Sequence, residues 1–244
     1  MFGLFESKKT VFQSGFLRGA SDSHSHILYG VDDGIKTAAE SLKTLALLEE
    51  AGVETLWLTP HIMEDVPNTT DGLMGRFDSL RELYKGRIEL HLAAEYMMDT
   101  LYVERLRRRD LLLHGANRVL VEASVSAAPF KLRDILNETF DMGYIPILAH
   151  PERYLYLSPD DYRELRSMGV LMQMNMFSLT GLYGEPVRER ALYLLGEGVY
   201  SIWGSDCHRL AVLKRQFGEP RIKKSVWDKV EALRFGFDKK EALS

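Results

Sequence analysis

The sequence predicts a parallel α/β barrel, because short apolar segments and amphipathic helical segments alternate about seven times along the chain. Most of the apolar segments are apolar on both faces, as expected for strands that are covered on both sides. About seven such units in a chain of 244 residues favour a closed barrel over an open sheet. No shift in composition marks a boundary, so we expect one domain over residues 1–244, with residues 1–20 as an N-terminal arm.

Two kinds of periodicity define the predicted elements. In the segment 37–51, Leu42, Leu45 and Leu48 recur at helical spacing, and Gly52 follows where a helix would stop. Short aliphatic runs between such segments predict strands. The predicted strands span residues 21–28, 53–58, 88–94, 118–122, 144–149, 170–175 and 199–203. The predicted helices span residues 37–51, 76–85, 130–142, 160–167, 187–196 and 225–234, and a Leu/Arg-rich helical stretch lies between the third and fourth strands.

Composition limits the classes of function. The net charge of −4 gives no reason to expect a general nucleic-acid binder. The single cysteine, Cys207, allows no intrachain disulfide and fits a reducing compartment, so we expect a cytoplasmic protein. No apolar run approaches the roughly 18 residues of a membrane span, so we expect no stable membrane insertion. Weak contact of the basic, aromatic arm with a membrane surface is the minority alternative to an arm packed on the domain.

Two pairs of potential metal ligands share the same spacing. His24 and His26 stand in the first predicted strand, and Asp206 and His208 follow the last one. Side chains on a strand alternate between its two faces, so both members of each pair should point the same way. Two imidazoles on one face can form part of a metal site when carboxylates lie nearby. Taken alone, however, a His-x-His motif fits a pair of surface histidines on an edge strand equally well. The number of partners elsewhere in the chain decides between these interpretations.

Cys207 lies between the members of the second pair, so the same alternation turns it toward the helices. A cysteine phosphatase would need an arginine at the sixth position after the cysteine, where this chain has Leu213. We therefore interpret Cys207 as a buried, inert thiol rather than as a nucleophile.

Other ligand types recur at strand ends. His61, Glu95, Glu122 and His150 end predicted strands, and Asp33 lies in the glycine loop after the first strand. The full candidate set is His24, His26, Asp33, His61, Glu95, Glu122, His150, Asp206 and His208. So many ligands suit two or three ions that share a bridging carboxylate. Mixed imidazole and carboxylate ligands favour Mn, Fe or Zn over Mg or Ca, whereas a structural zinc site is closed and usually contains cysteines. The two remaining histidines, His91 and His114, are interpreted as packing or surface residues.

Five motifs carry a family resemblance. In order, they are Asp-Ser-His-Ser-His-Ile-Leu-Tyr-Gly-Val-Asp-Asp-Gly, Thr-Pro-His, Ala-Glu-Tyr, Ala-His-Pro-Glu-Arg-Tyr and Gly-Ser-Asp-Cys-His. Together they resemble the motifs of the polymerase-and-histidinol-phosphatase (PHP) superfamily. Within it, they look like the CpsB/CapC (YwqE-like) family of bacterial protein-tyrosine phosphatases. The similarity runs from about Ser21 to His208, which is most of the chain.

The resemblance implies a fold and an activity. The fold would be a distorted (β/α)7 barrel of the PHP type, with the metal site at the C-terminal ends of parallel strands. The cofactors would be two to three divalent transition-metal ions, usually manganese. The activity would be hydrolysis of phosphotyrosine. The usual substrate of the family is the tyrosine-rich tail of a kinase that controls capsular or exopolysaccharide export, so the implied partner is a phosphotyrosine protein of that kind.

The resemblance also assigns the candidate ligands to three metals. The first metal would be held by His24, His26, Glu95 and Asp206. The second would share Glu95 as a bridge and be completed by Glu122 and His150. The third would be held by Asp33, His61 and His208. The second aspartate of the glycine loop matches the family's ligand, so Asp33 is preferred to Asp32.

Phosphate binding is assigned in the same way. Arg153 matches an arginine that would bind the phosphate. The family often has a second arginine at the position of Leu213, so the second phosphate contact would come from Arg209, Lys214 or Arg215. Five tyrosines lie near the motifs and could line the mouth of the site or pack the rim of the barrel: Tyr29, Tyr96, Tyr154, Tyr156 and Tyr183.

Several alternatives stay open. Asp33, His208 or a metal-bound water could assist the departing phenolate. A phosphatase of small molecules such as histidinol phosphate is the closest rival within the superfamily. A non-catalytic metal-binding subunit would be expected to have lost ligands, and this chain has lost none. A nucleic-acid phosphoesterase is disfavoured by the acidic charge balance.

Overall fold

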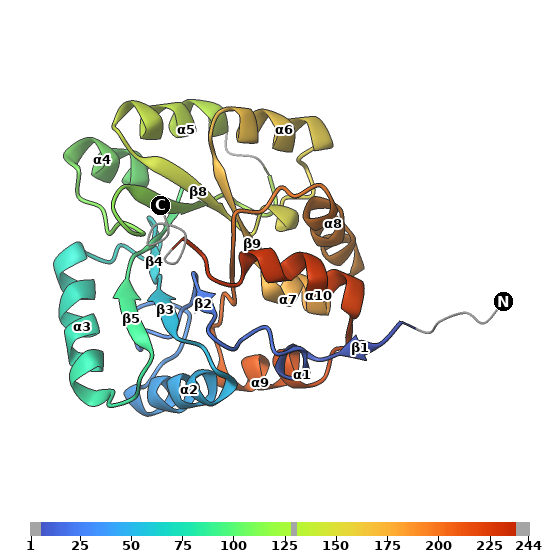
Figure 1. Ribbon diagram of the computed structural model, residues 1–244. Coiled ribbons are helices and arrows are strands. Elements are labelled where there is room, and N and C mark those ends of the chain that lie inside the picture. Colours follow the sequence, from blue (N-terminus) through green and yellow to red (C-terminus); the bar gives the residue numbers. More distant parts are fainter. Residues whose placement is uncertain (1–5, 128–130, 238–244) are drawn as a thin grey trace.

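The computed structural model describes residues 6–127 and 131–237, and it places strands at the centre with helices around them (Figure 1). The strands are β1 (Lys8–Lys9), β2 (Ser21–Asp22), β3 (Thr55–Leu58), β4 (His61–Ile62), β5 (Glu89–Leu92), β6 (Glu95–Met97), β7 (Arg118–Glu122), β8 (Ile145–Ala149), β9 (Leu171–Asn175), β10 (Ile202–Gly204) and β11 (Ile222–Lys223). The α-helices are α1 (Val11–Ser14), α2 (Ala38–Ala51), α3 (Thr70–Leu83), α4 (Thr100–Arg108), α5 (Leu132–Asp141), α6 (Pro159–Ser167), α7 (Met176–Thr180), α8 (Glu185–Gly196), α9 (Leu210–Gly218) and α10 (Lys224–Val230). Two 3₁₀ turns, η1 (Pro151–Arg153) and η2 (Glu231–Leu233), complete the described elements.

The parallel strands follow the order of a barrel. Six of them form a sheet in the order β10-β9-β8-β7-β6-β4, and three form a sheet in the order β2-β3-β5. The chain runs directly from β3 into β4 and from β5 into β6, so the nine strands of these two sheets occupy seven positions. A parallel bridge between Ser25 and Cys207, with His26 N donating to Cys207 O at 3.0 Å, joins the first strand segment to the last. The predicted distorted barrel of parallel strands is confirmed.

Alternation along the strands divides the core into two parts. Leu120, Ile147, Ala149 and Ile202 form a small cluster of their own inside the barrel, and all four are fully buried. The neighbouring strand residues, such as Val121, belong to the large cluster that packs against the helices. The interior cluster separates the C-terminal end of the barrel from its N-terminal end.

Helix α3 begins at Thr70 rather than at the predicted residue 76. The Thr69 side chain caps the helix by accepting a hydrogen bond from Gly72 N, and Asp71 lies in the first turn. Pro67, Asn68 and Gly72 indicate a loop before the helix, and a glycine lowers helix propensity. The N-cap and the first-turn carboxylate offset that cost.

The first strand is much shorter than predicted. Regular pairing covers only Ser21–Asp22, so His24 and His26 lie beyond β2 in an extended segment. The Asp22 carboxylate accepts hydrogen bonds from His24 N at 3.3 Å and Ser205 N at 2.8 Å, and these bonds replace part of the ladder. The alternation of side chains nevertheless continues through this segment, because both histidines point into the barrel.

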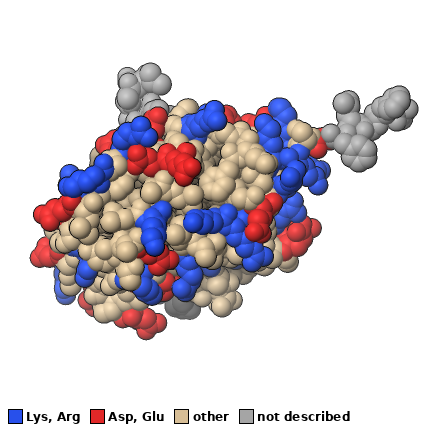
Figure 2. Space-filling model, turned by 90° about the horizontal axis from the view of Figure 1, so that it is seen from below, with Lys and Arg blue, Asp and Glu red and all other residues tan. Residues whose placement is uncertain are grey.

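The described part of the N-terminal arm packs on the barrel. Val11, Phe16 and Leu17 are buried, and β1 pairs with β11 in an antiparallel ribbon. None of the helices in the described ranges is both long and apolar enough to cross a membrane. Figure 2 views the molecule from below Figure 1 and shows basic and acidic side chains together on that face.

Candidate metal centre

The C-terminal ends of the strands surround a cavity of about 360 Å³. The cavity is lined by Asp33, His61, Glu95, Glu122, His150, Arg153, Phe177, Leu182, Tyr183, Asp206, His208, Arg209 and Val212. Seven of the nine candidate ligands therefore face it. The other two, His24 and His26, are fully buried and contact Glu95 and Asp206 below its floor.

The first group of ligand atoms is the most deeply buried. The Nε2 atoms of His24 and His26 are 3.1 Å apart, and each lies 3.2 Å from Glu95 Oε2. Asp206 Oδ1 lies 3.5 Å from His24 Nε2 and 3.4 Å from His26 Nε2. One ligand atom from each of these four residues falls within 4.8 Å of the others.

A second group forms around the other side of Glu95. His150 Nε2 lies 3.0 Å from Glu95 Oε1 and 3.7 Å from Glu122 Oε2. His61 Nδ1 lies 3.2 Å from both Glu95 Oε2 and Glu122 Oε1. The structure thus brings His61 to Glu95 and Glu122 at distances as short as those of His150, which the sequence did not predict.

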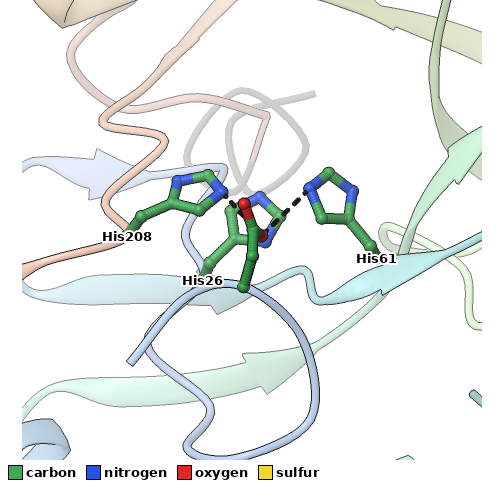
Figure 3. A group of neighbouring side chains, drawn as sticks. His26, His61 and His208 are labelled. Atoms are coloured by element: carbon green, nitrogen blue, oxygen red, sulfur yellow. Dashed lines mark ion pairs between the residues drawn. The ribbon is translucent and has the colours of Figure 1, made fainter. Parts of the chain in front are cut away.

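The third group, part of which is drawn in Figure 3, is the most exposed of the three, because the side chain of Asp33 is 70% exposed and that of His208 is 26% exposed. Asp33 Oδ1 is 3.3 Å from His208 Nε2 and 3.7 Å from His61 Nε2. The rings of His26 and His208 are stacked with their centroids 4.0 Å apart. His26 therefore stands between the first and third groups, and His61 between the second and third. The first aspartate of the loop, Asp32, points instead to His26 Nδ1 at 2.8 Å.

The ligand atoms of each group converge on one small region, as they would around a shared metal ion. Within the described residues, Glu95 Oε2 and His61 Nδ1 are buried and have no hydrogen-bond partner, although histidine nitrogens lie 3.2 Å from that oxygen. Bonds to a transition metal of about 2.0–2.2 Å place two ligand atoms up to roughly 4.4 Å apart. The spacing within each group agrees with this value, and nitrogen and oxygen donors suit such ions. The residues fit bound divalent metals.

Electrostatics also favour cations at this end of the barrel. Burial by itself lowers the pKa of His24, but the negative charges of Glu95 and Asp206 outweigh it and raise that pKa to about 9. Burial opposes ionisation of Glu95 and Asp206, yet the neighbouring histidines hold the pKa of both carboxyl groups below its usual value. Protons on the histidines balance the carboxylates in the metal-free protein, and divalent cations could replace those protons.

Two candidate ligands have unusual backbone conformations. His150 has φ of 34° and Asp206 has φ of 51°, in the left-handed region that non-glycine residues seldom occupy. Each follows directly after a barrel strand or its short extension, where the chain turns toward the next helix. Such conformations persist only when surrounding contacts enforce them, and they cluster at functional sites.

The candidate phosphate-binding residues occupy different places. Arg153 and Arg209 line the cavity. Arg153 Nη1 lies 3.5 Å from Asp206 Oδ2, and its guanidinium lies over the Tyr183 ring at 4.6 Å. Arg215 is outside the cavity lining, highly exposed, and 3.6 Å from Glu219.

Other residues have structural surroundings. Cys207 is fully buried in the core beside the helices, and burial raises the pKa of its thiol. His91 and His114 both stack on Trp57, and their ring centroids lie 4.5 and 3.8 Å from that of the tryptophan. Of the five tyrosines near the motifs, Tyr183 lines the cavity, whereas Tyr96 and Tyr154 are buried and accept backbone hydrogen bonds.

Sequence reasoning did not single out Asn175. Its Nδ2 donates to Asp206 Oδ2 at 2.8 Å, and Tyr183 OH donates to the same oxygen at 3.4 Å. The oxygen that faces away from the histidines is therefore also held in place. The available signal was a polar residue at the end of the predicted strand 170–175, whose other residues are apolar except for Gln173.

Comparison with known proteins extends this description. Residues 20–236 match the family model described as "Capsular polysaccharide synthesis, CpsB/CapC". The chain belongs to the CpsB/CapC family. All nine candidate ligands lie within the matched range, which agrees with the resemblance carried by the motifs.

Named relatives of this CpsB/CapC protein are similar over most of their length. The tyrosine-protein phosphatase CpsB of Streptococcus pneumoniae is 30% identical over 203 residues, which cover 78% of this chain and 83% of the relative. The tyrosine-protein phosphatase YwqE of Bacillus subtilis is 28% identical over 215 residues, which cover 81% of this chain and 85% of the relative.

Solved structures support the fold of the CpsB/CapC chain. A structure from a study of Bacillus subtilis YwqE and Streptococcus pneumoniae CpsB, described as "unique metal-dependent tyrosine phosphatases", matches with a TM-score of 0.72 and 24% identity. The match covers 87% of this chain and 93% of that one. An amidohydrolase from Mycoplasma synoviae matches with a TM-score of 0.53 and 12% identity, over 97% of this chain and 95% of that one. At these identities the likeness concerns the fold.

Proposed function

We propose that this CpsB/CapC protein is a metal-dependent protein-tyrosine phosphatase. Its substrate would be the tyrosine-rich tail of a kinase that regulates capsular or exopolysaccharide synthesis. One observation carries the proposal: nine ligand-type side chains lie together, seven lining a single cavity beside Arg153 and Arg209 and two buried directly below its floor. The relatives named as tyrosine-protein phosphatases support the substrate class.

The metal ligands in this proposal come from the three groups. They are His24, His26, Asp33, His61, Glu95, Glu122, His150, Asp206 and His208. Two or three divalent ions, with manganese preferred and iron or zinc as alternatives, suit this donor set. Such ions supply Lewis acidity that activates water and neutralises phosphoryl oxygens. Glu95 is the proposed bridge, because both of its oxygens face histidine nitrogens at 3.0–3.2 Å.

Arg153 would bind the phosphoryl group. Its guanidinium offers a planar pair of donors, which suits phosphate oxygens. Asp206 Oδ2 and the Tyr183 ring hold it at the cavity wall without burying it completely, because its side chain is 26% exposed. Arg209 is the second phosphate contact in this proposal, since it lines the cavity whereas Arg215 does not.

The phenyl ring of phosphotyrosine would lie against the apolar part of the same wall. Phe177, Leu182 and Val212 line the cavity beside the two arginines. The tyrosine phenolate leaves readily, because the pKa of its conjugate phenol is only about 10. Asp33 and His208, 3.3 Å apart at the outer edge of the cavity, would assist the departing phenolate by orienting the water that gives it a proton.

The proposal treats the whole chain as one phosphatase domain in the cytoplasm, where kinase tails are phosphorylated. The buried single thiol agrees with a reducing compartment.

The test is a comparison of substrates on the purified protein with manganese added. A phosphotyrosine peptide should be hydrolysed with a kcat/KM at least about tenfold above that of the matched phosphoserine peptide, because the serine analogue lacks the ring and has a poorer leaving group. Histidinol phosphate is the third substrate. A preference for histidinol phosphate would support a small-molecule phosphatase instead. If the metal-loaded protein hydrolyses none of these phosphomonoesters, a non-catalytic metal-binding subunit would be supported.

A further inference from the structure

We propose that Gln173 and Asp32 are positioning residues that aim His24 and His26 into the metal centre. Neither residue belongs to the nine candidate ligands, and each contacts a histidine on the ring nitrogen that faces away from the other ligands. The inference rests on the proposed metal centre, and it adds the residues that fix which histidine nitrogen can bind metal.

Gln173 lies inside the barrel on β9 and is fully buried. Its Oε1 is 3.0 Å from His24 Nδ1. The other end of the amide donates to Met174 O, which fixes the oxygen toward the histidine. An amide oxygen can only accept, so His24 Nδ1 must carry a proton, and Nε2 is the nitrogen that can release its proton and bind a metal. That Nε2 is the atom facing Glu95 and Asp206.

Asp32 plays the same part for His26. Its Oδ2 accepts from His26 Nδ1 at 2.8 Å and from His61 N at 3.1 Å, and its Oδ1 accepts from Gly34 N at 2.9 Å. Both oxygens are thus fixed by backbone donors, so the carboxylate cannot turn away from His26. His26 Nε2 then faces the same two acidic residues as His24 Nε2.

Two glycines leave room for these contacts. A Cβ on Gly204 would lie 2.5 Å from His24 Cβ and 2.7 Å from Gln173 Nε2. A Cβ on Gly34 would lie 2.5 Å from His26 Cβ and 2.9 Å from Asp32 Oδ1. No side chain fits at either glycine position. The glycine backbone therefore packs directly against each histidine and the residue that accepts its hydrogen bond.

Partners of this kind fix the tautomer and ring orientation of a metal-binding histidine, and their loss typically lowers metal affinity or activity about 10–100-fold. The two partners differ in charge. Asp32 makes His26 the more basic ligand, whereas the neutral Gln173 amide orients His24 without adding charge. We expect the loss of Asp32 to have the larger effect.

The first experiment measures binding of Mn²⁺ to metal-stripped protein, with free Mn²⁺ followed by electron paramagnetic resonance. Gln173→Leu should raise the Kd of the tightest site about 10–100-fold. Gln173→Glu keeps an acceptor at the same place and should restore most of the affinity. Gln216→Leu is the matched control, because Gln216 is also buried and hydrogen-bonded, to Thr180, but contacts no candidate ligand.

The second pair of variants applies the same logic to Asp32. Asp32→Ala should raise the Kd by at least as much, and Asp32→Asn, which retains an acceptor oxygen, by less. Asp99→Ala is the control, because Asp99 likewise accepts two backbone hydrogen bonds, from Glu64 N and Tyr102 N, and within the described residues it has no hydrogen bond or ion pair with a histidine. It should lower thermal stability and leave the Kd for Mn²⁺ unchanged.

A measurement on the unaltered protein keeps the inference testable if a variant does not fold. In long-range ¹H–¹⁵N NMR spectra of the zinc-loaded protein, His24 and His26 should each show a proton on Nδ1 and coordination through Nε2. Coordination through Nδ1, or full Mn²⁺ affinity in Gln173→Leu and Asp32→Ala, would overturn the inference alone. If the unaltered protein binds neither Mn²⁺ nor Zn²⁺, the proposed function fails with it.

Discussion

Each end of the barrel contains a buried histidine, and the two histidines differ in whether carboxylates lie beside them. His24 lies at the C-terminal end of the strands and His114 just before β7 at the other end, and both are almost fully buried. Burial alone lowers the pKa of each. At His24 the carboxylates of Glu95 and Asp206 reverse that effect and raise the pKa to about 9. At His114 burial prevails and lowers the pKa to about 3.

The surroundings of His114 explain the difference. It stacks on Trp57, its Nε2 donates to Ser23 O at 3.1 Å, and Phe237 approaches its ring edge-on at 6.3 Å. The interior cluster around Ile147 lies beside Phe237 and separates this end from the carboxylates. A histidine in this setting serves packing, whereas one facing several carboxylates is suited to hold a metal.

The largest expected effect comes from removing the shared carboxylate. Glu95→Ala should lose at least one metal ion per chain and lower kcat/KM on the order of 1000-fold or more, because both oxygens of Glu95 face histidine nitrogens. Elemental analysis and steady-state kinetics measure both effects. Glu138→Ala removes a half-buried carboxylate paired with Arg107 and should change neither. Full metal content in Glu95→Ala would show that the bridge is elsewhere.

Arg153→Ala should separate substrate binding from metal binding. One bidentate contact to a charged group is worth about 2–4 kcal/mol, so kcat/KM should fall roughly 30- to 1000-fold. Metal content and Tm should stay near normal, because Asp206 Oδ2 keeps its hydrogen bond from Asn175. The loss should be equal for a phosphotyrosine peptide and para-nitrophenyl phosphate, which present the same phosphoryl group.

The control for Arg153 is Arg188→Ala, which removes an arginine paired with Glu185 on α8 and should leave kinetics unchanged. A loss toward the peptide alone would make Arg153 a contact for the substrate chain. A loss of metal would place it among the supports of the metal centre.

His114 should make the protein less stable in acid. Its folded pKa of about 3 lies below the unfolded value of about 6.5, so the unfolded state binds one more proton between these values. Its contribution is intact above pH 6.5 and is lost as the pH falls toward 3. From pH 6.5 to 5 the loss is roughly 2 kcal/mol, at about 1.4 kcal/mol per pH unit. Denaturant unfolding of metal-stripped protein at several pH values measures it.

His114→Gln keeps a donor for Ser23 O but cannot titrate, so its stability should decline less steeply between pH 6.5 and 5. The remaining titrating groups are the same in both proteins, and the difference in slope isolates His114. Equal slopes would mean that His114 is protonated in the folded state, and the contrast between the two ends would then be wrong.

Local rules predicted the part of the centre that depends on neighbours in sequence. Alternation with period two places His24 with His26 and Asp206 with His208, and the structure agrees even where the regular strand ends at Asp22. The approach of His61 to Glu122 was not predictable in this way. It depends on how the chain passes from β3 in one sheet to β4 in the other, which is a property of the tertiary fold.

The positioning contacts were hidden for a related reason. Gln173 and His24 are 149 positions apart in sequence, so no local pattern joins them. Similarly, Pro67, Asn68 and Gly72 indicate a loop, whereas the Thr69 cap lets α3 begin at Thr70. Strand order and alternation are encoded locally, whereas the partner of a buried polar atom is decided by tertiary packing.

The smallest expected effect is at the seam between the first and last strands. Cys207 bridges to Ser25 through its backbone, while its side chain lies in the core with Sγ 3.9 Å from Arg209 O. Cys207→Ser should therefore keep kcat/KM within about twofold, while burial of the hydroxyl should lower stability by about 1–3 kcal/mol, because Arg209 O is too far away for a hydrogen bond from the new Oγ. Iodoacetamide should leave the folded protein active, since burial raises the pKa of the thiol and keeps it protonated. Lost turnover with normal Tm and metal content would instead show that the thiol takes part in the reaction, and alternation would have failed at the residue between Asp206 and His208.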